Sequence, residues 1–120
     1  MNEKKNALKE KSFAFALRII KLHQYISRDK REFVLSKQVL RSGTSIGAMI
    51  REAQNAESKA DFVHKLAIAQ KECDETIYWL ELLAQSGYIT EPEFESINLE
   101  AMGLLKMIRS AILTFKSNNA

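Results

Sequence analysis

The scarcity of turn-forming residues constrains this sequence more than any other feature. The 120 residues include only four glycines and one proline, whereas average usage would give roughly eight and six. Sheets and Rossmann-type domains need many turns, and Gly, Pro, Asn and Asp supply most of them. At this length we expect a single domain over 1–120, large enough to bury a core without a metal or a disulfide. The chain is therefore predicted to fold into a few long elements.

Apolar residues recur at intervals of three, four and seven, the spacing of one face of an α-helix. Four such segments are predicted, over residues about 8–28, 30–54, 59–86 and 91–116. The residues of the apolar faces are Leu8, Phe15, Ile19, Leu22 and Ile26; Phe33, Val39, Leu40, Ile46 and Ile50; Phe62, Leu66, Ala69, Cys73, Thr76, Leu80 and Leu83; and Phe94, Ile97, Ala101, Leu105, Ile108, Ile112 and Phe115. Short connections between four amphipathic helices favour an all-α fold, an antiparallel up-down-up-down four-helix bundle.

Capping motifs mark the predicted helix ends. The expected N-terminal pairs are Asp29 with Glu32, Ser58 with Asp61, and Thr90 with Glu93. Gly87 is placed to adopt a left-handed conformation after the third helix.

Two glycines lie inside the second predicted helix. Gly43 and Gly47 share one side with Ser36, at spacings of seven and four. An interior glycine costs about 1 kcal/mol of helix propensity relative to alanine. We therefore expect a seam of small residues that lets another helix approach closely, the alternative being a break in the helix.

The sequence favours a cytoplasmic location and no membrane partner. The first residues are charged rather than apolar, so no signal peptide is predicted. The longest uncharged run, Ser42 to Ile50, is too short for a membrane span of about 20 residues. Cys73 is the only cysteine, so no disulfide can form within one chain.

The two halves of the chain carry opposite charge. Residues 1–51 contain twelve basic and four acidic residues, net +8, and residues 52–120 contain six basic and eleven acidic residues, net −5. Basic residues of the first helix recur at spacings of three and seven, which stacks them into a stripe roughly 35 Å long. The candidate phosphate contacts are Lys4, Lys11, Arg18, Lys21, Arg28, Lys30 and Lys37. Three readings stay open: a polyanion-binding surface, a solvated face, or two halves that attract each other within or between chains.

No catalytic or metal site is predicted. Asp61 and His64 lie one turn apart, but a di-iron bundle needs a second copy of that motif. Glu72 and Glu75 could form an acid–base pair, yet no nucleophile can be placed beside them. Cys73 lies on a core-facing line. We therefore expect no enzyme activity, no cofactor and no small-molecule substrate. The weaker alternative is a metal-dependent enzyme that uses Asp61, His64, Glu72 and Glu75.

Polar and apolar residues outside the core lines predict two further features. An ion pair between Arg41 and Glu75, with Ser45 nearby, would fix the register of the second and third helices. Apolar residues partly outside the seams predict an oligomer interface, although a broad interior would also accommodate several of them. These residues are Met49, Tyr78, Trp79 and Leu82, together with Met102, Met107 and Leu113.

Residues 38–53, with the sequence QVLRSGTSIGAMIREA, resemble the second-helix signature of bacterial four-helix-bundle proteins encoded in 23S ribosomal RNA intervening sequences. The resemblance continues through 61–69, 75–76, 79–83 and 86–89, and covers about 10–115. The family's Arg, Ser-Ile and Glu positions fall on Arg41, Ser45-Ile46 and Glu52, which adds Glu52 to the structural polar network.

The resemblance implies a left-handed bundle that assembles as a ring-like homo-oligomer, a pentamer, without known catalytic activity and with a link to RNA. The accessory proteins of diversity-generating retroelements form a related branch that is similar in fold to this family, and they are thought to bind nucleic acid. We therefore expect a non-enzymatic, oligomeric protein that binds RNA or another nucleic acid through its basic stripe. The alternative is a homo-oligomeric interaction scaffold without nucleic-acid binding.

Overall fold

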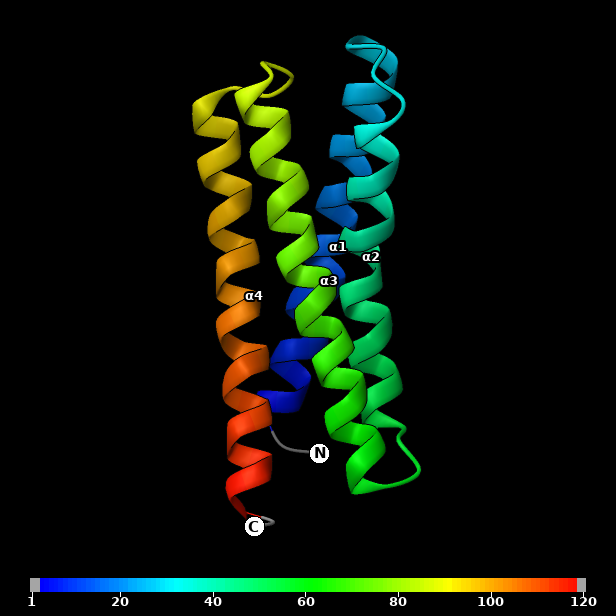
Figure 1. Ribbon diagram of the computed structural model, residues 1–120, viewed down its shortest axis with the longest axis vertical. Helices are drawn as coiled ribbons and strands as arrows, with labels where there is room; N and C mark the ends of the chain where they lie inside the picture. The colour runs from blue at the N-terminus through cyan, green and yellow to red at the C-terminus, as the bar shows by residue number, and fades with distance from the viewer. Residues whose placement is uncertain (1–2, 119–120) are drawn as a thin grey trace.

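The chain folds into an elongated bundle of four antiparallel helices (Figure 1). The computed structural model describes the backbone of residues 3–118 and the side chains of residues 7–117. The helices are α1 (Glu3–Asp29), α2 (Leu35–Gln54), α3 (Lys59–Gln85) and α4 (Glu91–Asn118). The bundle measures 48 × 22 × 20 Å, and the described residues form no strand. The predicted all-α, up-down-up-down bundle is confirmed.

The core consists of the apolar face of each helix. Ile19, Val39, Ile46, Leu80 and Ile108 are completely or almost completely shielded from solvent. Helix α2 packs closely against α1 and α3, and α4 packs against α3, whereas α1 and α4 make far fewer contacts with each other. The α1–α4 edge is therefore the most open side of the bundle.

Two of the three predicted caps form as expected. The Asp61 N–H donates to the Ser58 hydroxyl at 3.1 Å. The N–H of Thr90 donates to the Glu93 carboxylate at 2.8 Å, and the Glu93 N–H donates back to the Thr90 hydroxyl at 3.3 Å. Gly87 has φ +83°, as predicted, and the backbone bonds that end α3 around it are those of a Schellman motif.

The connection between α1 and α2 differs from the prediction. Asp29 is the last residue of α1 and caps no helix, and α2 begins at Leu35 instead of near residue 30. Glu32 replaces the expected cap, because its carboxylate accepts from the N–H groups of Val34, Leu35 and Ser36 at 3.1, 3.0 and 2.8 Å. The chain reverses through Arg31, whose φ is +54°.

This connection also removes Phe33 from the core, where the sequence pattern placed it. Phe33 lies in the loop before α2 and is 59% exposed. The α-helical spacing that grouped it with Val39 and Leu40 does not apply, because the helix has not yet begun at that residue.

The seam of small residues on α2 faces α1. A Cβ at Gly43 would lie 2.8 Å from two side-chain carbons of Ile19, and one at Gly47 would lie 3.4 Å from the Ser12 hydroxyl. Ser36, on the same side, is fully buried. The helix is unbroken here, so the prediction of close helix packing is confirmed.

Candidate nucleic-acid interface

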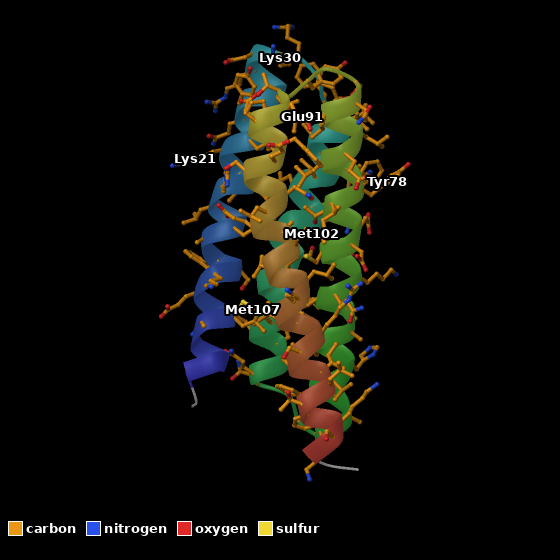
Figure 2. All side chains as sticks on the ribbon, turned by 90° about the vertical axis from the view of Figure 1, so that its left-hand side faces the viewer. Lys21, Lys30, Tyr78, Glu91, Met102 and Met107 are labelled. Carbon is orange, nitrogen blue, oxygen red and sulfur yellow. The ribbon has the colours of Figure 1, made fainter. Side chains whose placement is uncertain are left out.

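The predicted basic stripe follows α1 and continues into the connection to α2. Lys11, Lys21, Arg28, Lys30 and Lys37 are exposed, and none of them forms an ion pair among the residues that the structure describes. Figure 2 shows Lys21 pointing away from the bundle and Lys30 at its end. The side chain of Lys4 lies outside the described residues.

Arg18 is the exception in the stripe. Its guanidinium donates to the Glu100 carboxylate at 2.5 Å and to the Ser96 hydroxyl at 2.7 Å, both on α4. The charge of Arg18 is therefore paired with that of Glu100 within the chain, while 35% of the Arg18 side chain stays exposed.

The acidic first half of α4 lies beside the basic second half of α1, because the two helices run in opposite directions. The pKa of the Glu93 carboxyl lies below its ordinary value, chiefly because the Thr90 N–H donates to it, with a smaller contribution from the nearby charge of Lys30. Glu93 therefore lies near enough to Lys30 for their charges to attract, although the two side chains form no ion pair. Carboxylates of α4 therefore lie near the basic residues of α1 both at Lys30 and, through Glu100, at Arg18.

The α1–α2 end of the bundle combines cations with exposed apolar and aromatic groups. Arg28, Lys30, Arg31 and Lys37 are exposed there. Among them lie Phe33 and Val34, which are 59% and 71% exposed, and Tyr25, whose ring lies 5.9 Å from the Lys30 ammonium. We call these seven residues the basic end. Sequence reasoning missed Arg31, Phe33 and Tyr25 as site residues, although aromatic residues among closely spaced cations were a readable signal.

The predicted ion pair between Arg41 of α2 and Glu75 of α3 is present, but the other members of the network differ from the prediction. Arg41 donates to Glu72 at 2.8 Å and also to Glu75, and the Trp79 indole N–H donates to Glu75 at 3.3 Å. Glu72 was not predicted; it is nearly buried. The hydroxyl of Ser45 instead donates to the Arg41 carbonyl at 2.6 Å.

Glu52 lies outside that network, contrary to its predicted place in it. Its carboxylate pairs with Lys65 of α3 at 3.1 Å. Both pairs connect α2 to α3, so Arg41 and Glu52 hold the same two helices at separate points.

Most of the predicted oligomer-interface residues pack within the chain. Met49 and Trp79 are partly buried against the core, and Leu82 is half-buried. Tyr78 is 54% exposed and its ring contacts that of Trp79. Larger exposed apolar surfaces lie on α1, at Phe13, Leu17 and Ile20, and on α4, at Leu99 and at the predicted Met102 and Leu113. The residues on α1 and Leu99 were not among those predicted from the sequence.

The remaining candidate chemical groups do not assemble into a site. Among the described side chains, those of residues 7–117, no three from His, Cys, Asp or Glu lie close enough together to hold a metal ion. Burial raises the pKa of the Cys73 thiol to about 12, and its sulfur lies 3.2 Å from the Ala101 carbonyl, to which it donates. No described helix is long and apolar enough to cross a membrane.

Comparison with known proteins identifies the family. The model of the 23S rRNA-intervening sequence protein family matches residues 4–110. The chain belongs to this family. A crystal structure of a protein with unknown function from the S23 ribosomal protein family, from Bacteroides thetaiotaomicron, shares 53% sequence identity with this chain and superposes on it with a TM-score of 0.90. That match covers 91% of this chain and 97% of the other. No curated protein matches the sequence.

Proposed function

We propose that this member of the 23S rRNA-intervening sequence family is a non-enzymatic, homo-oligomeric protein that binds RNA or another nucleic acid through its basic end. The observation that carries the proposal is the cluster of four exposed cations around Phe33, Val34 and Tyr25. The family name, with its reference to 23S rRNA, supports RNA as the ligand.

The chemistry of the basic end fits an unpaired strand. Lys and Arg side chains neutralise phosphates without reading the sequence. An exposed aromatic ring such as Phe33 offers a surface on which an unpaired base can stack, and stacking tolerates any base. The basic end supplies both cations and an exposed aromatic ring in and beside the short connection between α1 and α2. The central part of the stripe supplies only charge, and the charge of Arg18 there is already paired with Glu100.

A titration with a fluorescent single-stranded RNA tests this proposal. The variant Lys30→Glu/Arg31→Glu/Lys37→Glu should bind more weakly, and the slope of log affinity against log salt should fall by about 2, since each single-strand phosphate contact contributes about 0.7. The matched control, Lys59→Glu/Lys71→Glu/Lys116→Glu, changes net charge equally at exposed sites elsewhere and should bind nearly as well as the natural chain.

Two results would overturn nucleic-acid binding at this end. One is the absence of binding by the natural chain at low salt. The other is an equal loss of affinity in both triple variants, because net charge alone would then account for the effect.

The second candidate function is an interaction scaffold in which opposite charges pair with each other. The contact of Arg18 with Glu100 favours it, because a residue of the basic half is already neutralised by one of the acidic half. Light scattering separates the two. An oligomer that dissociates in high salt and does not bind RNA favours the scaffold, and a monomer at micromolar concentration contradicts the homo-oligomer in both.

A further inference from the structure

Two apolar helix faces have no partner within the chain. On α1, Phe13, Leu17 and Ile20 are 51%, 48% and 36% exposed; on α4, Leu99, Met102 and Leu113 are 75%, 47% and 68% exposed. We refer to these as the α1 face and the α4 face. We infer that the α1 face of one copy packs antiparallel against the α4 face of the next, with Leu17 over Gly103. This inference rests on the proposed homo-oligomer and specifies its interface.

The α4 face is hollowed around Gly103. A shallow depression on it is lined by Leu99, Met102, Gly103, Leu105, Lys106 and Arg109. A Cβ at Gly103 would meet nothing within 4 Å, whereas one at Gly43 would collide with Ile19. Packing within the chain therefore does not require Gly103, although glycine is among the poorest residues for a helix interior. A helix that approaches from outside gives this glycine a role.

The two faces point to different sides of the molecule. Arg51 of α2 lies over the Phe13 ring at 5.4 Å, so the α1 face leans toward α2. Arg109 lies 3.9 Å from Asp74 of α3, so the α4 face leans toward α3. Figure 2 shows Met102 on the outer side of α4 while Lys21 extends away from α1. One copy can therefore use both faces at once, which is the condition for a ring or an open chain of subunits.

The direction of the contact follows from the topology. Helices α1 and α4 run in opposite directions within each chain (Figure 1). Copies that stand side by side, related by rotation about an axis parallel to the bundle, therefore bring α1 and α4 together antiparallel.

The exposed charges that flank the two faces favour the same direction. With Leu17 over Gly103 in an antiparallel pair, Glu10 lies within about one turn of Lys106 and Arg109, and Lys21 lies about one turn from Glu95. A parallel pair in the same register would place Glu10 beside Glu95 and Lys21 beside Lys106. Opposite charges meet in the first arrangement and like charges in the second.

Cross-linking between two differently labelled chains tests the contact. We would co-express one chain carrying Leu17→Cys with another carrying Gly103→Cys and treat the assembled protein with a short bis-maleimide. The natural Cys73 is buried and should not react. Cross-linked dimers are expected from the mixture, and none from either single variant alone, because the contact joins two different faces.

Light scattering on three further variants supplies a second readout. Leu17→Glu should dissociate the oligomer at micromolar concentration, and Gly103→Ala should weaken association without loss of helicity. Tyr78→Glu places a charge on the exposed α3 residue that was predicted from the sequence to lie at the interface, and it should leave the oligomer intact. Dissociation by Tyr78→Glu but not by Leu17→Glu would overturn the α1–α4 contact. An oligomer that resists Leu17→Glu and yields no mixed cross-link would overturn this interface while leaving the homo-oligomer standing. A natural chain that is monomeric would overturn the homo-oligomer itself.

Discussion

Gly43→Ala is the sharpest test of how α1 and α2 pack. The added Cβ would lie 2.8 Å from both Cγ1 and Cγ2 of Ile19 and 3.1 Å from its Cδ1. Ile19 is β-branched and fully buried, so it has little freedom to rotate away. Overpacking of this kind costs about 1–3 kcal/mol, and the gain in helix propensity offsets about 1 kcal/mol of it. We expect a net loss of about 1 kcal/mol, which corresponds to a fall of several degrees in Tm.

Chemical denaturation of Gly43→Ala, Gly47→Ala and the natural chain measures this difference. At Gly47 the nearest atom is the Ser12 hydroxyl at 3.4 Å, so the alanine there should be tolerated much better. In a double-mutant cycle, Ile19→Ala removes the atoms that the new Cβ meets. The double variant should therefore lose less free energy of unfolding than the two single variants lose in sum. A Gly43→Ala protein more stable than the natural chain would refute the close approach.

Three further predictions concern single polar groups. Partial burial favours the neutral Glu32 carboxyl, but its three backbone N–H donors favour the anion more strongly and lower its pKa. The natural chain should therefore be more stable than Glu32→Gln above about pH 4.5, and this advantage should shrink as the pH falls through the lowered pKa. Denaturation curves measured at each pH give the difference. The Cys73 thiol, with a pKa of about 12, should react with a thiol reagent at neutral pH only on unfolding, and rapid labelling of the folded protein would contradict its burial. Arg41→Ala should cost about 1–2 kcal/mol by leaving the nearly buried Glu72 carboxylate without its partner, an estimate reduced because Arg41 is 49% exposed, and Lys65→Ala, at the more exposed pair with Glu52, should cost less.

The parts of the fold that could be predicted from the sequence depend on contacts between neighbours in the chain. The bond of Asp61 to Ser58, the reciprocal pair of Thr90 and Glu93, and the turn at Gly87 each form within a few residues. Gly43 was recognisable because an interior glycine is costly in a helix and needs a reason. Its partner, Ile19, lies on another helix and could not be identified without the structure.

The failures have the same origin. Asp29 and Glu32 together fit a capping box, but whether Asp29 can cap α2 depends on how far α1 continues, which its packing in the bundle determines. Arg18 fitted the stripe by its spacing, but its position beside α4 brings it to Glu100, 82 residues further along the chain. Spacing shows which residues share a helix face, but not which neighbouring helix lies across from that face.

The two proposals reinforce each other through geometry. Copies related by an axis parallel to the bundle all point the same way, so their basic ends gather at one rim of the assembly. Each end alone offers few phosphate contacts and one exposed Phe33 ring, which predicts weak binding. Once one basic end has bound a long RNA, the other basic ends at the rim are present at high effective concentration around that RNA. The affinity of the oligomer therefore rises, although each basic end binds as it does alone. A dissociated chain that keeps an intact basic end should then bind a short oligonucleotide about as well as the oligomer does, while its affinity for a long RNA falls sharply.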